Sequence, residues 1–188
     1  MSPNKARIVA VFGSSRVASS SAEYAEAYTL GKLLAQHGFV VMNGGYQGTM
    51  EASARGAREA GGHTIGMLSR EFGALTPNPY LDETWVAPDL YTRIREMQRR
   101  ADAFVVLKGS MGTLAELALV WNFAKIDARQ RKPILLLGEA WANVLRALRE
   151  HLVVTPDEVE LLEVVETPAQ AIQLLEERLR WKHDGASQ

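Results

Sequence analysis

The chain has 188 residues, which fits one domain with a sizeable buried core. Its 21 Lys and Arg residues balance 22 Asp and Glu, so the net charge is −1 and no overall basic field attracts nucleic acid or an anionic membrane. Cysteine is absent, which excludes disulfides, thiolate nucleophiles and cysteine-based zinc sites. We therefore expect neither nucleic acid nor a membrane as a partner.

No targeting or membrane-spanning segment is recognisable in the sequence. The first residues lead directly into an apolar strand and lack the longer apolar stretch of a signal peptide. Nowhere does the chain hold about 18 consecutive apolar residues, the length that a bilayer-spanning helix needs. The expectation that follows is a cytoplasmic protein.

Short apolar runs typical of buried strands alternate with helix-length segments along the whole chain. The predicted strands are 7–13, 39–42, 63–67, 83–87, 103–107, 132–137 and 161–165. The predicted helices between and after them are 22–37, 49–60, 89–100, 113–126, 141–152 and 168–181. This alternation predicts repeated βαβ units and hence a Rossmann-like, doubly wound parallel sheet with helices on both faces. We expect one α/β domain over residues 1–181, and a frayed tail over 182–188.

Several helix ends carry recognisable signals. Ser20–Glu23 has the spacing of a capping box, and Gly38 follows the first helix as a typical stop. Thr155-Pro156 and Thr167-Pro168 each place a cap residue before a proline at the first helical position. The segment 68–82 has no clear period and is long enough to form a lid or a binding loop.

Three of the predicted strands end in glycine- or serine-rich turns that lead into helices: 13–15, 43–48 and 108–113. Ligands bind beyond the carboxyl ends of the strands in sheets of this kind, and such turns let backbone N–H groups and a helix dipole approach an anion. Together they predict a phosphorylated, nucleotide-sized ligand, unless the glycines merely make tight turns. The first turn lacks the G-x-G-x-x-G fingerprint and the chain has no P-loop, which disfavours ordinary NAD binding and P-loop hydrolysis.

Two charged residues lie near the third turn: Glu116 in the predicted helix after it, and Arg93 in the predicted helix before the strand that leads into it. Thr113 and Glu116 are three residues apart, so both face the same side of a helix near its positive end. The same spacing also fits a capping box, and the pattern leaves both interpretations open. Arg93 begins an arginine-rich stretch that is usually a solvated helix face. The histidines are scattered without the spacing of metal ligands, so no metal is expected: His37, His63, His151 and His183.

Four segments in order carry a family resemblance: Val11–Ser15 (VFGSS), Asn43–Met50 (NGGYQGTM), Arg93–Met97 (RIREM) and Lys108–Glu116 (KGSMGTLAE). With them, the chain resembles the LOG (LONELY GUY) family over residues 7–137. Members of that family are phosphoribohydrolases that act on cytokinin riboside 5′-monophosphates and were long labelled lysine decarboxylases.

The resemblance implies hydrolysis of the N-glycosidic bond of a nucleoside 5′-monophosphate, to free base and ribose 5-phosphate, with no metal or organic cofactor. It implies that Arg93 and Glu116 are the catalytic residues. The residues expected to bind substrate or phosphate are Gly13, Ser14, Gly44, Gly45, Gly48, Lys108, Gly109, Ser110, Gly112 and Thr113.

The sequence departs from the family pattern in two loops. Lys108-Gly109-Ser110 stands where the family has Pro-Gly-Gly, and Asn43 replaces the first glycine of the second loop. Ser110 resists a positive φ and so reshapes the loop, whereas Lys108 either adds charge for a phosphate or points to solvent. These departures keep a second hypothesis open: a non-catalytic binder of a nucleotide-like ligand, similar to carriers of the molybdenum cofactor. A pyridoxal-phosphate decarboxylase is a weaker third, because no aldimine lysine is identifiable.

The segment 113–126 is apolar around much of its circumference, which is more than one contact with a sheet requires. We expect a homodimer through this helix, as the family resemblance also implies. The alternative is that C-terminal elements cover the second apolar face.

Overall fold

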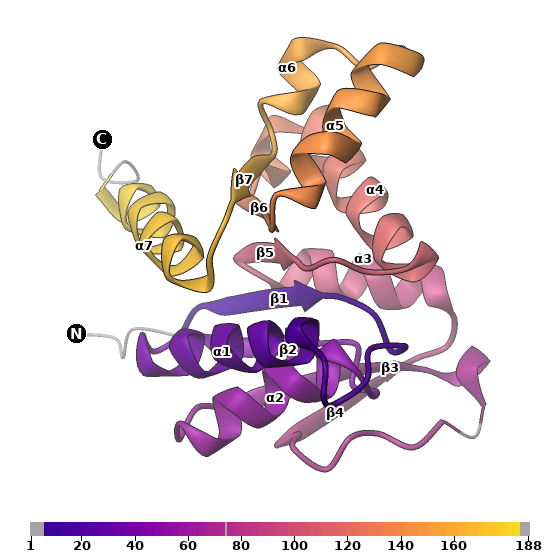
Figure 1. Cartoon of the computed structure of the whole chain (residues 1–188), viewed down its shortest axis with the longest axis vertical. Coiled ribbons are helices and arrows are strands. Elements are labelled where there is room, and N and C mark those ends of the chain that lie inside the picture. The colour runs from indigo at the N-terminus through magenta and orange to yellow at the C-terminus, as the bar shows by residue number, and fades with distance from the viewer. Residues whose placement is uncertain (1–5, 74, 185–188) are drawn as a thin grey trace.

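The computed structural model describes residues 6–73 and 75–184. In this part of the chain seven parallel strands form one sheet in the order β4-β3-β2-β1-β5-β6-β7 (Figure 1). The strands are β1 (Ile8–Phe12), β2 (Val40–Asn43), β3 (Thr64–Ser69), β4 (Glu83–Ala87), β5 (Ala103–Val106), β6 (Ile134–Leu137) and β7 (Glu163–Val165). The predicted α/β class and the parallel sheet are confirmed.

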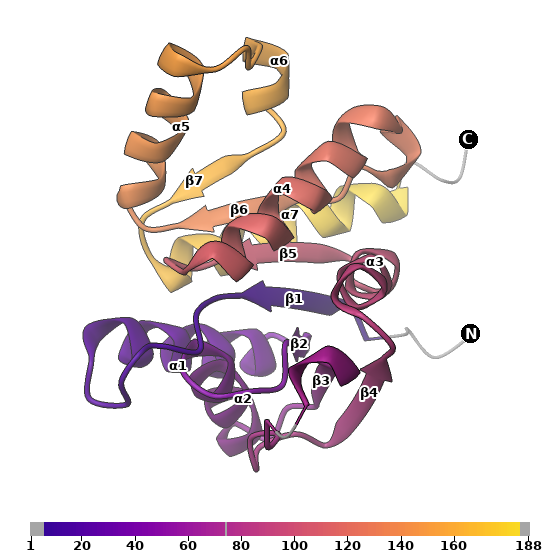
Figure 2. The ribbon, with the colours of Figure 1, turned by 90° about the vertical axis from the view of Figure 1, so that its right-hand side faces the viewer.

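Helices cover both faces of this sheet, as Figures 1 and 2 show. The helices are α1 (Ala22–Gln36), α2 (Thr49–Glu59), α3 (Leu90–Arg100), α4 (Met111–Ile126), α5 (Ala140–His151), α6 (Pro156–Val159) and α7 (Pro168–Asp184), with short 3-10 turns η1 (Arg70–Phe72) and η2 (Ala128–Gln130). The core side chains of α1, α2 and α7 belong to one apolar cluster, and those of α3, α4 and α5 belong to the other.

The central strands are buried on both faces, which explains their unbroken apolar runs. In β1, Val9 and Val11 join the cluster beneath α1, α2 and α7, whereas Ala10 and Phe12 join the opposite cluster. The Phe12 ring stacks on that of Phe104 in the neighbouring strand, with ring centres 5.6 Å apart. Because successive strand residues point to opposite faces, each of the central strands β1, β2, β5 and β6 supplies both halves of the core.

Helices α1 and α2 approach each other closely, and two glycines make this possible. A Cβ atom at Gly31 would lie 2.0 Å from the carbonyl oxygen of Ser53, and one at Gly56 would lie 2.0 Å from that of Tyr28. Any side chain at either position would push the helices apart. This close contact fixes the position of α2, whose first turn borders the site described below.

The strand order places a topological switch point between β1 and β5. After β1 the chain adds β2, β3 and β4 on one side, and β5, β6 and β7 follow on the other. The loops that leave β1 and β5 therefore diverge at neighbouring strand ends, which is where open α/β sheets bind ligands.

Two predicted helix starts need correction. Ser21 caps α1, accepting a hydrogen bond from Tyr24 N at 3.2 Å, so the capping box predicted from Ser20 is displaced by one residue. Helix α4 begins at Met111, two residues earlier than predicted, with Ser110 as its N-cap and Thr113 as the partner of that cap. The predicted capping box of Thr113 and Glu116 is therefore wrong, because Glu116 lies in the second turn.

The remaining differences are at element ends. The caps at Thr155 and Thr167 are confirmed. Strand β3 continues to Ser69, so the segment predicted as irregular from residue 68 begins with two strand residues and η1. Helix α7 runs to Asp184, three residues beyond its predicted end, so part of the segment predicted as a frayed tail is helical; residues 185–188 lie outside the described range.

Candidate functional site

A cavity of about 150 Å³ opens at the carboxyl ends of the strands, beside the first turns of α2 and α4. Its lining residues are Gly13, Ser15, Tyr46, Met50, Phe72, Leu75, Arg93, Ser110, Gly112, Thr113 and Glu116. The structure thus brings Arg93 and Glu116 together with four of the other predicted site residues. The cavity lies at the switch point, where the fold predicts a ligand.

The centre of the site is a buried ion pair. The Nη1 atom of Arg93 donates to Oε1 of Glu116 at 3.1 Å, and the two side chains are only 5% and 8% exposed. Arg93 Nε also donates to the carbonyl oxygen of Met67 at 2.6 Å, so the guanidinium is anchored to β3 as well as to α4. Helix α3, which carries Arg93, is capped at its N-terminus by Asp89, whose carboxylate accepts from Thr92 N.

Gly44 makes room for this guanidinium. A Cβ atom at Gly44 would lie 2.0 Å from Nη2 of Arg93 and 2.5 Å from Sδ of Met50. No real Cβ atom tolerates such contacts, so a side chain at this position would displace the arginine. The predicted site residue Gly44 therefore acts through Arg93, by leaving space for it.

The environment of Glu116 changes its acid–base behaviour. Burial raises the pKa of Glu116 to about 7, although the nearby positive charge of Arg93 acts in the opposite direction. The carboxyl group is therefore present in both protonation states near neutral pH. A carboxyl group with a pKa close to the working pH is suited to taking and returning a proton.

The start of α4 supplies the polar end of the cavity. Ser110 N donates to the Thr113 hydroxyl, while the first N–H groups of any helix lack partners within it. A Cβ atom at Gly109 would lie 2.1 Å from Thr113 Oγ1, so this position requires a glycine for the loop to close on the helix. At Gly112 such an atom would meet nothing within 4 Å, so the space beside the helix start is open. These features are typical of an anion site at a helix N-terminus.

The loop between β2 and α2 shapes the neighbouring wall. Gly45 and Gly48 have φ values of +80° and +68°, which favour glycine. The side-chain amide of Asn43 donates to Met50 O at 2.8 Å and accepts from Gly45 N at 2.8 Å, so Asn43 stabilises this turn. Ser14 O accepts from Thr49 N, which ties the first loop to α2. Asn43, Gly45, Gly48 and Ser14 hold the wall in shape from outside the cavity lining.

Lys108 does not line the cavity. Its Nζ atom donates to Oε1 of Glu23 at 3.1 Å, and its side chain is 67% exposed. A hydrogen bond from its own backbone and then the Lys108 ammonium lower the pKa of Glu23. Of the two possibilities that the sequence leaves open, the side chain takes the outward one and pairs with α1.

Five lining residues were not predicted from the sequence: Ser15, Tyr46, Met50, Phe72 and Leu75. Ser15 lies in the first turn, next to the predicted Ser14. Tyr46 and Met50 lie inside the second glycine-rich segment, and Phe72 and Leu75 inside the segment predicted as a binding loop. The sequence signal thus covered these regions without indicating which side chains face inward. Among the described residues no group of three or more His, Cys, Asp or Glu side chains could hold a metal, and no helix is long and apolar enough to cross a membrane.

Comparison with known families and proteins identifies the chain's relatives. The model of the SLOG cluster4 family matches residues 6–171. The chain belongs to this family. The resemblance to LOG proteins that the sequence motifs predict is thereby confirmed. Among SLOG relatives, the cytokinin riboside 5′-monophosphate phosphoribohydrolase of Mycobacterium tuberculosis is 32% identical over 156 residues, covering 78% of this chain and 82% of the relative.

Two further proteins illustrate the breadth of these similarities. An Arabidopsis thaliana protein, also named cytokinin riboside 5′-monophosphate phosphoribohydrolase, is 28% identical, covering 94% of this chain and 85% of its own length. The solved structure of the molybdenum cofactor carrier protein from Chlamydomonas reinhardtii superposes with a TM-score of 0.70 at 26% identity, covering 94% of this chain and 99% of that one. This SLOG protein is thus similar both to proteins that are named hydrolases and to a protein that is named a cofactor carrier.

Proposed function

We propose that the protein hydrolyses the N-glycosidic bond of a nucleoside 5′-monophosphate, either a cytokinin riboside monophosphate or an AMP-like nucleotide. The observation that carries this proposal is the buried pair of Arg93 and Glu116, one turn along α4 from a helix start with the features of an anion site. Relatives with 28–32% identity bear the corresponding enzyme name. The products are a free base and ribose 5-phosphate.

Each part of the site has a role in this reaction. The first turn of α4 binds the 5′-phosphate and thereby positions the ribose over Glu116. As the bond between C1′ and the base nitrogen breaks, positive charge develops on the ribose, and a carboxylate beside it stabilises that charge. The oxygen of a water molecule bonds to C1′ and Glu116 takes the proton that the water loses. The departing base nitrogen takes up one proton from solvent, and Glu116 then returns its own proton to solvent, so the carboxylate is restored. Arg93 holds Glu116 in place and offsets negative charge on the departing base.

The direct test is a panel of nucleotides. AMP, IMP, GMP and N6-isopentenyladenosine 5′-monophosphate are incubated with the purified protein, and the free base is separated by chromatography. Release of a stoichiometric amount of ribose 5-phosphate is measured in the same samples. We expect at least one purine monophosphate to be cleaved with repeated turnover. Recovery of every nucleotide intact would contradict the proposal.

A second candidate is a non-catalytic carrier of a nucleotide-like ligand such as the molybdenum cofactor. The similarity to the carrier protein at 26% identity favours it, as does the unusual Lys108-Gly109-Ser110 loop. A carrier would return its ligand intact after long incubation, whereas a hydrolase would not. A ligand that is bound tightly, copurifies unchanged and is never cleaved would therefore select this candidate.

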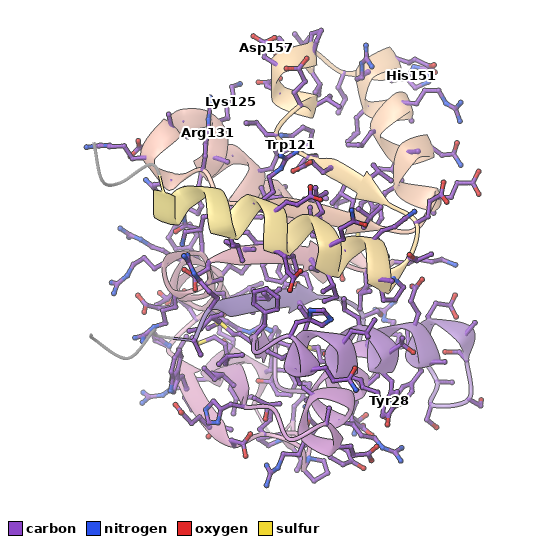
Figure 3. All side chains as sticks on the ribbon, turned by 90° about the vertical axis from the view of Figure 1, so that its left-hand side faces the viewer. Tyr28, Trp121, Lys125, Arg131, His151 and Asp157 are labelled. Carbon is purple, nitrogen blue, oxygen red and sulfur yellow. The ribbon has the colours of Figure 1, made fainter. Side chains whose placement is uncertain are left out.

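We further propose that the outer face of α4 forms a homodimer interface. Met111, Leu114 and Ile126 are 77%, 39% and 72% exposed, an unusual amount of apolar surface for a single helix. A groove of about 200 Å³ adjoins this face, lined by Trp121, Lys125 and five further residues from α4 to α6, near Asp157 in Figure 3. Light scattering at micromolar concentration should give about twice the chain mass, and Leu114→Glu should give a monomer. A monomeric wild-type protein would contradict this interface.

A further inference from the structure

One end of the cavity is apolar, and its chemistry differs from that of the ion pair and the helix start. Tyr46, Met50, Phe72 and Leu75 line this end. The ring of Phe72 lies edge-on to that of Tyr46, with centres 5.6 Å apart and planes at 80°. Phe72 is 37% exposed and Leu75 57% exposed, so apolar side chains face solvent beside the charged groups of the cavity. Such side chains suit contact with an apolar or aromatic group.

The surrounding contacts hold this surface in a defined position. The Tyr46 hydroxyl donates to Ser69 O at 3.3 Å and accepts from Ser69 N at 3.1 Å. Ser69 also caps η1, which carries Phe72. The Glu71 carboxylate accepts from Leu90 N at 2.7 Å, which joins the same short turn to the start of α3. The aromatic surface is therefore attached to β3 and α3 before any ligand binds.

Neighbouring pairs connect the helix start, Glu116, Arg93 and Phe72 in series. From Thr113 in the first turn of α4 to Glu116 the helix rises about 4.5 Å. Arg93 follows at 3.1 Å from Glu116, and the Phe72 ring follows with its centre 5.8 Å from Arg93 Cζ. A nucleoside 5′-monophosphate has its phosphate, ribose and base in the same order. A phosphate at the helix start and a ribose at Glu116 thus direct the base toward Phe72.

We propose that Phe72 is the stacking surface for the nucleobase, and that this SLOG protein recognises the base by its ring face. This inference rests on the proposed nucleotide substrate. The Tyr46 hydroxyl already donates to the backbone of Ser69 and accepts from it. The side chains of Phe72 and Leu75 carry no polar atom. Met50 has only a weakly accepting sulfur. These four side chains leave nothing to read the edge of a base. Stacking tolerates different bases, because every base has a π-face.

The experiment measures binding separately from hydrolysis. All proteins carry Glu116→Gln so that bound nucleotide persists, and calorimetry gives dissociation constants for AMP, IMP and ribose 5-phosphate. We expect AMP and IMP to bind within about tenfold of each other. Adding Phe72→Ala should weaken both by about tenfold or more, in the range of one stacked base. Ribose 5-phosphate has no base, so its affinity should change by less than about twofold, and Phe72→Tyr should restore nucleotide binding.

Several results would overturn the inference. AMP affinity that is unchanged in Phe72→Ala would remove the stacking role, and an equal loss for ribose 5-phosphate would show that Phe72 acts through Arg93. A difference between AMP and IMP of about a hundredfold or more would indicate that the base edge is read, and absence of AMP binding would also exclude the site. If AMP binds through Phe72 but the wild-type protein never cleaves it, the stacking surface stands and the proposed hydrolysis fails.

Discussion

Two ion pairs flank the start of α4. Their nitrogen–oxygen distances are the same, but one pair is exposed to solvent and the other is buried. Lys108 and Glu23 are 3.1 Å apart at the surface, with side chains 67% and 37% exposed. Arg93 and Glu116 are also 3.1 Å apart, but they lie inside the cavity wall at 5% and 8%. The pKa of Glu23 is lowered, whereas burial raises that of Glu116 to about 7. Burial, and not the distance between the charges, decides which carboxyl group can exchange a proton near neutral pH.

The physical reason is the competition between solvation and pairing. Water and salt screen an exposed pair, so such a pair contributes little beyond its local hydrogen bonds. In a buried pair each charge has lost its hydration, and the partner compensates only in part. The outer pair therefore links α1 to the β5–α4 loop, while the inner pair is the one that we propose to be chemically active.

The same substitution in both pairs gives the sharpest test of this contrast. Glu116→Gln keeps the shape and an acceptor for Arg93 but removes the proton-accepting carboxylate, so turnover of the cleaved nucleotide should fall by about 10³-fold. Glu23→Gln, the matched control at the surface, should leave turnover within about twofold. Steady-state kinetics and melting curves of both variants check this. Equal losses in the two variants would remove the distinction between the pairs.

A methyl group at Gly44 tests whether the inner pair depends on the exact place of Arg93. Because the new Cβ atom would lie 2.0 Å from Nη2, Gly44→Ala should displace the guanidinium and lower kcat/KM by about 10²-fold. The control is Gly61→Ala, whose φ of +79° strains the backbone although nothing lies within 4 Å. That variant should lower the melting temperature and leave kcat/KM unchanged. Full activity in Gly44→Ala would show that Arg93 can move without consequence.

The raised pKa of Glu116 predicts the direction of the pH dependence. The carboxylate is the form that accepts a proton from water, and it becomes protonated as the pH falls through about 7. The value of kcat/KM should therefore be constant above this pH and decrease about tenfold for each unit below it. A pH–rate profile from 5 to 9 measures this. An increase toward low pH would instead assign Glu116 as a proton donor.

The smallest effect is expected for the outer cation. Lys108→Ala removes an exposed charge whose ammonium pairs with Glu23, so KM for the nucleotide should rise by no more than about twofold, with kcat unchanged. Measurements at low and high salt separate long-range attraction of the phosphate from direct contact. A rise in KM of about tenfold would mean that Lys108 turns from Glu23 to the phosphate when substrate binds.

Much of the architecture follows from local patterns in the sequence. The apolar run around Val9 and Val11, flanked by a glycine-rich turn, predicts a buried strand because both faces of a parallel sheet are covered. The alternation of such runs with helices predicts the parallel sheet, and the sheet in turn predicts a ligand at the strand ends. The positions of Arg93 and Glu116 were predicted through motifs that resemble the LOG family, although the helix pattern by itself also allowed a cap.

Tertiary structure alone decided how these residues act. Arg93 and Glu116 are separated by most of α3, β5 and the start of α4, so their contact depends on how two helices pack on one sheet. The space at Gly44, the outward pairing of Lys108 and the inward ring of Phe72 depend on that packing too. Local sequence determines which backbone form a segment adopts, because that choice involves near neighbours. Burial, and with it the pKa of a carboxyl group, is set by side chains that are distant in the chain.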